Sequence, residues 1–306
     1  MKKRYFSSFI ILTFVVAVSY SQSVSFLNTP SDARTAAMGN AGYMISSPFS
    51  VQYNSISIMA DNDVATGVGA SLLFWQPQAI DATLVNVAGY HRFNKLGIMA
   101  GYRSNKMSDI EKTDVNGNIL GTYAPSEYAL DLGVGYNVSD NISLGVALHH
   151  ISSRLDQESS SSALASDISI LYHRERIRVG IGVANLGSKI DYGYAEYSLP
   201  TRIKSGVAYR FSSGGDHALY SVADLYYQLA DNYEGIAGGL GMEYCYRDML
   251  FLRTGYHHES ENVGASYATV GLGTKFSQIS LDLAYLAAQE NNPISQTFLI
   301  SLKWER

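Results

Sequence analysis

The chain has 306 residues, a net charge of −5 and only 16% charged residues. The acidic balance leaves no basic footprint, so we expect no nucleic-acid partner. The counts of 27 Gly and 23 Tyr against six Pro favour many strands with tight turns over helices. The one cysteine, Cys245, cannot form an internal disulfide.

Residues 1–21 have the pattern of a secretory signal peptide. Basic residues at positions 2–4 precede an apolar stretch at 6–18, which is too short to span a membrane as a helix. Small residues at Ser19 and Ser21 suit cleavage after Ser21. The alternative is a single membrane anchor, which the length of the stretch disfavours. We therefore expect an exported protein.

The next segment, residues 22–62, lacks a long periodic pattern and is rich in small residues between positions 31 and 42. Small residues let a backbone pack closely against a wall, so we expect an N-terminal hatch that plugs the lumen of a barrel. The alternative is a flexible periplasmic leader.

From residue 63 to residue 306 the chain divides into segments of about ten residues, the length that a tilted strand needs to cross a bilayer. No stretch after the signal approaches the ~20 apolar residues of a membrane helix, and backbone groups in lipid must pair internally, which requires a closed barrel. Fourteen strands are expected: 63–75, 81–93, 96–107, 127–137, 142–154, 163–173, 177–184, 202–211, 218–228, 234–246, 250–258, 267–276, 279–287 and 295–304.

Several of these segments alternate between an apolar face that ends in aromatic residues and a small or polar face. Residues 128–136 and 298–304 show this pattern, with Leu299 as an exception. Segment 218–228 fits badly because Asp224 shares a face with apolar residues, and we expect a bulge or a misplaced boundary there. A soluble sandwich with one buried face shows the same period, so alternation alone leaves both folds open.

The connections favour the membrane barrel, because longer and very short ones alternate along the chain. Long loops on one rim and tight turns on the other are typical of outer-membrane barrels. Charged residues in the strands are expected on the inner face, since a Lys or Arg facing lipid at the bilayer midplane costs about 2–4 kcal/mol. The expected inward charges are Asp131, Asp167, Arg178, Arg202, Lys204, Arg210, Glu243, Lys275, Asp282 and Lys303.

Three blocks of the sequence resemble the PorV/PorQ family of Bacteroidetes outer-membrane proteins, whose members look like relatives of the FadL fatty-acid transporters. The first block is Asp32, Ala33, Arg34, Met38 and Gly39, and the second is Tyr53 and Asn54, without the Pro and Ala that usually follow. The third comprises residues 253–256, 271–273 and 281–285.

The resemblance implies a fourteen-stranded transmembrane antiparallel β-barrel with an N-terminal hatch, in the outer membrane and associated with type IX protein secretion. PorV-like members bind the signal domains of exported cargo or dock against the translocon, and PorQ-like members act in attaching cargo at the surface. The chain is short for a PorV-like member, which favours a PorQ-like or unassigned one. Loops 108–126 and 185–201 are the candidate contacts for secretion components or cargo.

No pattern for catalysis, a metal or a cofactor is found, so we expect a non-enzymatic protein without cofactors. The histidine pairs at 149–150 and 257–258 cannot chelate as units, because neighbours on a strand point to opposite faces. Residues 114–118 resemble the start of a calcium loop without its terminal Glu, and Asn116-Gly117 instead predicts a hairpin turn.

Two other functions remain open. The first is a FadL-like channel for a hydrophobic small molecule, which requires an apolar pocket between hatch and wall. That pocket would lie near Phe26, Leu27, Met38 and Met44. The second is a structural barrel that contacts outer-membrane lipid and has neither activity.

Overall fold

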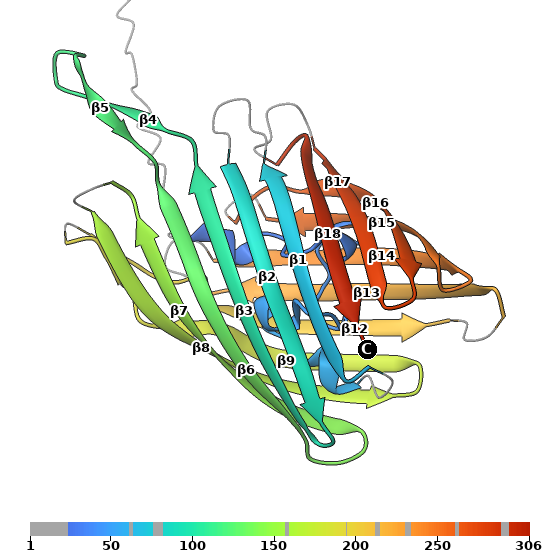
Figure 1. Ribbon diagram of the computed structural model, residues 1–306. Helices are drawn as coiled ribbons and strands as arrows, with labels where there is room; N and C mark the ends of the chain where they lie inside the picture. The colour runs from blue at the N-terminus through green and yellow to red at the C-terminus, as the bar shows by residue number, and fades with distance from the viewer. Residues whose placement is uncertain are drawn as a thin grey trace, which may run out of the picture.

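The computed structural model describes residues 24–60, 64–75, 82–156, 159–193, 195–211, 215–229, 234–260, 263–288 and 294–306. Within them, fourteen strands form one closed antiparallel ring in the order β1-β18-β17-β16-β15-β14-β13-β12-β9-β8-β7-β6-β3-β2 (Figure 1). The predicted all-β barrel is confirmed. The predicted signal peptide at residues 1–21 lies outside the described part of the chain.

The strands agree with the sequence expectation in number and nearly in their bounds. The ring consists of β1 (Thr66–Trp75), β2 (Ala82–Phe93), β3 (Leu96–Met107), β6 (Ser126–Asn137), β7 (Ile142–Arg154), β8 (Ser160–Arg174), β9 (Ile177–Gly187), β12 (Arg202–Arg210), β13 (His217–Gln228), β14 (Gly235–Tyr246), β15 (Leu250–Glu259), β16 (Tyr267–Phe276), β17 (Ile279–Ala287) and β18 (Thr297–Glu305).

The ring is closed by the first and last strands. β1 pairs with β18 in a register that runs from Gly67 opposite Glu305 to Phe74 opposite Phe298. The backbone of Thr66 and Arg306 continues this ladder with two further hydrogen bonds of 2.8 Å. Closure leaves no free edge in the ring, which is the condition for a sheet to lie in hydrocarbon.

Two small hairpins extend the long connections. β4 (Ile110–Thr113) pairs with β5 (Ile119–Tyr123), as the Asn-Gly turn predicts, and β10 (Ile190–Asp191) pairs with β11 (Glu196–Tyr197). The β4–β5 hairpin projects well beyond the ring (Figure 1). The Asp114 side chain holds its turn by accepting hydrogen bonds from the backbone of Asn116 and from the backbone and side chain of Asn118.

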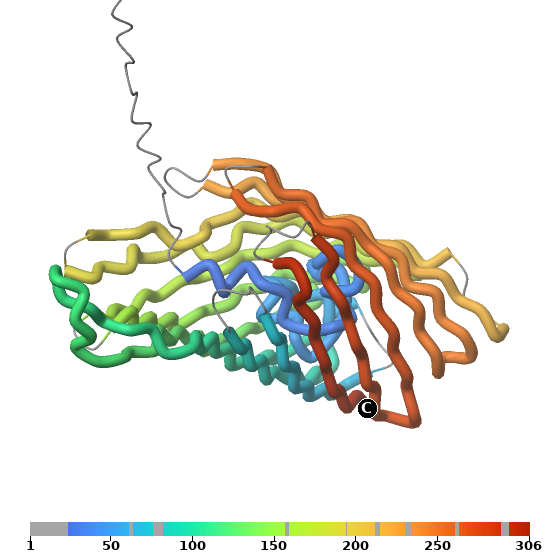
Figure 2. The backbone as a smooth tube through the Cα atoms, turned by 90° about the horizontal axis from the view of Figure 1, so that it is seen from above, coloured from blue at the N-terminus to red at the C-terminus, as the bar shows by residue number. Residues whose placement is uncertain are grey.

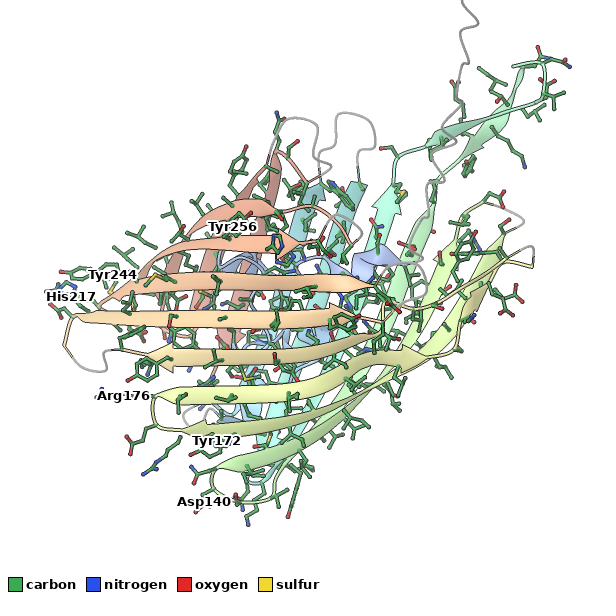
Figure 3. All side chains as sticks on the ribbon, turned by 180° about the vertical axis from the view of Figure 1, so that it is seen from behind. Asp140, Tyr172, Arg176, His217, Tyr244 and Tyr256 are labelled. Carbon is green, nitrogen blue, oxygen red and sulfur yellow. The ribbon has the colours of Figure 1, made fainter. Side chains whose placement is uncertain are left out.

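The outer face of the ring is apolar and the inner face is polar. On β6 and β7 the side chains at 128–136 and 142–148 that the alternation placed together are all exposed outward, from Tyr128 to Leu148. Seven of the ten charges expected inside are buried, and Arg178, Arg210 and Lys275 line the interior nearer the rim. Figure 3 shows the side chains that cover the outer wall. None of the helices in the described residues is long and apolar enough to cross a membrane.

Residues 24–60 lie inside the ring, where Figure 2 shows them enclosed by the strands. They form only short helices: η1 (Ser25–Asn28), α1 (Ala33–Ala36), η2 (Ser50–Tyr53) and η3 (Ser57–Ala60). Nearly every residue of this interior segment is buried. Its apolar side chains join three clusters with inward side chains of the strands. The interior segment supplies the apolar partner that the inner wall otherwise lacks.

The two irregularities in the sequence pattern have a common cause. β13 keeps an unbroken register with both neighbours, so the expected bulge or misplaced boundary is wrong. Its inward face carries Val222, Asp224 and Tyr226 because these side chains pack against or bond to the interior segment. Leu299 on β18 is likewise buried in a cluster with Phe26 and Leu27. Apolar residues on the inner face therefore mark contacts with the interior segment.

Candidate functional site

The first family block lies at the start of α1, against β18. Asp32 begins this short helix, and its carboxylate accepts a hydrogen bond from the Thr35 backbone at 3.1 Å. The Ala33 backbone donates to the Ser301 hydroxyl on β18 at 2.7 Å. The backbones of Ser31 and Asp32 both donate to the Tyr53 hydroxyl, at 2.8 and 3.1 Å. Tyr53, from the second family block, thus fixes the entry to α1.

Arg34 joins the interior segment to the wall through ion pairs. Its guanidinium makes a bidentate pair with Glu243 on β14, with N···O distances of 2.9 and 2.7 Å. Arg253 on β15 also donates to Glu243, at 2.6 Å, and to Asp282 on β17, at 2.7 Å. Asp282 is 2.9 Å from Lys303 on β18. We call these five residues the Arg34 network.

Within the Arg34 network, the Arg253–Asp282 ion pair passes over β16, which lies between β15 and β17. It can do so because β16 has a glycine, Gly273, at that position. A Cβ atom on Gly273 would meet the Asp282 carboxylate and the Arg253 guanidinium at under 3.0 Å. Gly273 is directly opposite Asp282 in the ladder. The glycine therefore leaves the space in which the Arg253–Asp282 ion pair forms.

The second half of the first block packs backbone to backbone against β14 and β15. Cβ atoms on Gly241 and Gly255 would clash with the backbone of Met38 and Gly39. Gly39 has a φ of +69° and lies against the carbonyl oxygens of Tyr256 and Leu240. The Thr269 hydroxyl accepts from the Gly39 backbone at 3.0 Å and donates to the Ala37 carbonyl at 2.9 Å. The first and third family blocks are thus in direct contact.

On the opposite wall the interior segment is held by side chains. His149 on β7 bridges Asp131 on β6 and Asp167 on β8, with 2.6 Å from each ring nitrogen to a carboxylate oxygen. Arg103 on β3 makes two hydrogen bonds to Asp131, at 2.9 and 3.1 Å, and Asn54 donates to Asp167 at 2.8 Å. We call these five residues the His149 network.

Lys204 on β12 extends this contact along the wall. Its ammonium donates to the Tyr53 carbonyl at 2.6 Å and to the Asn54 side-chain oxygen at 3.2 Å. It also lies 5.0 Å and 4.9 Å from the ring centroids of Tyr43 and Tyr226. A buried ammonium held by carbonyls and aromatic faces is compensated without an ion pair. The second family block is thus bound to β8 and β12.

The residues expected to form an apolar pocket are all buried but lie in two clusters. Phe26 and Leu27 pack with Leu286 and Leu299, towards the end of the barrel that carries the long loops. Met38 and Met44 pack in the other cluster, towards the short turns. The structure therefore does not bring these four side chains together, and a hydrophobic pocket at this place stays a prediction.

A cavity of about 240 Å³ lies between the interior segment and the short-turn rim. Its walls are strongly polar. Arg34, Arg178, Arg210 and Tyr220 line one side, and the other four residues of the Arg34 network line the other. Among the described residues no group of three or more His, Cys, Asp or Glu side chains could hold a metal ion. The Arg34 network pairs the charges on one side of this cavity.

Sequence reasoning identified most of the inward charges but missed their connections. Arg103 was not among the expected inward residues, although its even spacing from Gly101 and Asn105 on β3 is the signal that could have found it. The pairing of Arg253 with two carboxylates could not be predicted, because it depends on which strands are neighbours.

A family model described as "Type IX secretion system protein PorV" matches residues 17–224, about two-thirds of the chain. The chain belongs to the PorV family. The match spans the first two blocks and the strands from β1 to most of β13. Membership identifies an outer-membrane-type β-barrel associated with type IX secretion. The expectation of a PorQ-like member, which was based on length, stays a prediction.

Solved structures with similar folds are FadL-like barrels. The Ralstonia pickettii toluene transporter TbuX matches with a TM-score of 0.59 and 11% identity, covering 90% of this chain and 97% of that chain. The CymD monoaromatic hydrocarbon channel matches with a TM-score of 0.63 and 12% identity over 94% and 98%. A Pseudomonas aeruginosa FadL homologue matches with a TM-score of 0.52 and 12% identity over 90% and 98%. At these identities the similarity concerns the fold alone. No curated protein matches the sequence significantly.

Proposed function

We propose that this protein is a non-enzymatic outer-membrane barrel that acts as an accessory component of type IX protein secretion or of cargo attachment at the cell surface. The observation that carries the proposal is the PorV family match over about two-thirds of the chain. Export by a signal peptide cleaved after Ser21 is part of the proposal, and N-terminal sequencing of the mature protein tests that part.

The interior segment supports a partner-based role. We propose that residues 22–62 form a hatch, because the Arg34 and His149 networks fix this segment to two walls of the barrel. A buried ion pair is costly to break when one partner is left behind. A hatch held in this way suits a protein that acts through its rims, with its lumen filled.

The long-loop rim offers contact surfaces for a partner. The β4–β5 hairpin exposes Val115, Ile119 and Leu120 at its tip, and a two-stranded hairpin has a free edge on each side. Exposed apolar side chains beside unpaired strand edges are suited to binding another protein. We propose loops 108–126 and 185–201 as the sites that contact secretion components or cargo signal domains.

The deciding experiment is a deletion strain complemented with the wild-type protein or with a variant in which residues 110–123 are replaced by a short Gly-Ser turn. We expect the deletion to reduce secreted and surface-attached cargo, and the hairpin variant to fold, reach the membrane and restore cargo poorly. The matched control shortens the connection between β7 and β8, which is on the same rim and outside both proposed loops. Normal secretion and display of all cargo in the deletion strain would contradict the proposal.

The second candidate is a FadL-like channel for a hydrophobic small molecule. It is favoured by the fold shared with two proteins described as a toluene transporter and a monoaromatic hydrocarbon channel. Native mass spectrometry of gently solubilised protein, with toluene and with a long-chain fatty acid as probes, tests it. Stoichiometric binding that is lost in a Met38→Asp variant would support the channel, and no retained ligand would exclude it. A structural barrel would show neither binding nor a cargo defect.

A further inference from the structure

Three arginines lie together on the inner face at the short-turn rim. Arg176 lies in the turn before β9, Arg178 is the second residue of β9, and Arg210 is the last residue of β12. The Arg210 backbone donates to the Arg176 carbonyl at 2.9 Å, so these two residues are neighbours across the strand pair. All three line the polar cavity, and Figure 3 shows Arg176 at the turn that joins β8 to β9. We call this group the arginine shelf.

The arginine shelf has no carboxylate partner in the described chain. No Asp or Glu oxygen there lies within 4.0 Å of its guanidinium nitrogens. The cavity's own carboxylates Glu243 and Asp282 each already bind two cations, and Asp248 is 3.3 Å from Lys275. Like charges opposite each other on a strand pair repel, so this arrangement gains stability from an added anion.

Two further carboxylates line the cavity and offset part of the positive charge of the arginine shelf. Glu175 lies in the β8–β9 turn, and Glu305 accepts a hydrogen bond from the Tyr90 hydroxyl at 3.4 Å. With both included, seven Lys or Arg side chains line the cavity against five carboxylates. The excess is therefore positive, and it lies on the β9–β12 side.

The volume of the cavity and the row of cations that leads into it indicate the kind of anion. A cavity of about 240 Å³ is smaller than the pockets that hold drug-sized ligands, and it accommodates one or two acidic side chains. Cations follow one another from exposed Arg176 and Arg210 at the rim, through half-buried Arg178, to Arg34 inside. A row of cations matches a chain segment with several carboxylates better than it matches a single small ion.

We propose that the arginine shelf binds an acidic peptide segment of a partner protein that approaches the rim of short turns. The β8–β9 connection at this rim is only two residues long, so it does not cover the shelf. Arginine suits this role because its planar guanidinium binds a carboxylate through two parallel hydrogen bonds. The proposal adds to the proposed function the chemistry of a partner that binds at the rim opposite the long loops. It rests on the proposed function only in assigning that partner to secretion.

The test uses the purified barrel in lipid nanodiscs and a fluorescein-labelled hexaglutamate peptide, with binding followed by fluorescence anisotropy at two salt concentrations. We expect binding that weakens with salt and that falls at least tenfold in an Arg178→Gln/Arg210→Gln variant. The matched control is Arg174→Gln, which removes the same charge from an exposed outward residue of β8 at the same rim. A hexaglutamine peptide is expected not to bind.

Several outcomes would overturn the proposal. Equal affinity of the double variant and the wild type would remove the shelf as the site, and no binding by the wild type would remove the site altogether. Displacement of the peptide by inorganic phosphate or free glutamate at the peptide's own concentration would show a small-anion site instead. Heat-modifiable migration on gels verifies that each variant is folded. The cargo phenotype of the deletion strain tests the secretion role separately, so failure of one does not decide the other.

Discussion

The interior segment contacts two walls of the barrel by different physical means. On β14–β16 the contact is backbone to backbone, and glycines at 241 and 255 provide the space. On β6–β8 the contact is made by side chains, because Asn54 donates to Asp167 and His149 holds that carboxylate from the wall. An atom added at 241 or 255 would meet the backbone of the interior segment, whereas the β6–β8 contact depends on keeping its hydrogen-bond partners. The Arg34 network combines both, since its ion pairs cross a glycine on β16.

The largest effect is expected from Glu243→Gln, which keeps the side-chain shape but leaves Arg34 and Arg253 without their shared anion. Removing one partner of a buried ion pair typically costs about 3–5 kcal/mol in the free energy of unfolding. The measurement is urea unfolding of the barrel in detergent micelles, followed by tryptophan fluorescence.

The control for this variant is Asp216→Asn, which makes the same chemical change in the exposed Arg247–Asp216 pair. Exposed pairs contribute less than about 1 kcal/mol. Equal losses in the two variants would mean that burial does not strengthen the Arg34 network.

The next effect is expected at His149. His149→Ala removes hydrogen bonds to two buried carboxylates, and we expect a loss of about 2–3 kcal/mol because each carboxylate loses one of its buried partners. The neighbouring His150 points outward, so His150→Ala is the matched control and is expected to change the unfolding midpoint little. If both substitutions had the same effect, the bridge between Asp131 and Asp167 would not contribute to stability.

A somewhat smaller effect is expected where the glycines of β14 and β15 contact the interior segment. A Cβ atom on Gly255 would overlap the backbone at Met38 and Gly39, so Gly255→Ala is expected to cost about 1–3 kcal/mol and to expose the interior segment to protease. Gly89→Ala is the control, because Gly89 lies on a strand but faces away from the interior. Limited proteolysis and unfolding midpoints measure both. Protection of the interior segment in Gly255→Ala would contradict the close contact.

The smallest effect is expected in the β4–β5 hairpin. Hydrogen bonds from the Asn118 side chain and backbone hold the pKa of the Asp114 carboxyl below its usual value. Because the pKa of Asp114 is lowered in the folded hairpin, the charged carboxylate stabilises the turn fully above the usual pKa near 4. This stabilisation is lost as the pH falls through the lowered pKa. Amide hydrogen exchange at residues 110–123 is expected to rise in Asp114→Ala but not in Glu111→Ala. Equal exchange at these amides in Asp114→Ala and in the wild type at pH 7 would contradict this.

The fold could be predicted because a membrane imposes a simple rule on each strand. Outward residues such as Val134 and Val146 must be apolar and inward residues such as Asp131 are not, so alternation and loop length together give strand number and bounds. Leu299 and Asp224 do not follow this rule, and the sequence of their own strands does not explain why. Both respond to the interior segment, whose course across the lumen has no periodic signal.

The candidate site could be predicted only in part. The first block marked Arg34 as important, but its partner Glu243 is 209 residues away along the chain. Residues expected to form one apolar pocket instead occupy two clusters, because the chain between Leu27 and Met38 leads from one cluster to the other. Such long-range pairing depends on the order of strands around the ring.

Pairing of β1 with β18 has a consequence for how the molecule is assembled. The two strands that complete the ring are separated by more than 220 residues, so their ladder has a larger loop-closure cost than a hairpin between consecutive strands. Until the ladder forms, Thr66–Trp75 and Thr297–Glu305 both present open hydrogen-bonding edges, which are templates for mispairing between molecules. Seam formation is therefore the late, slow event expected of contacts so distant in sequence, and a carrier that shields both edges would be needed up to that moment.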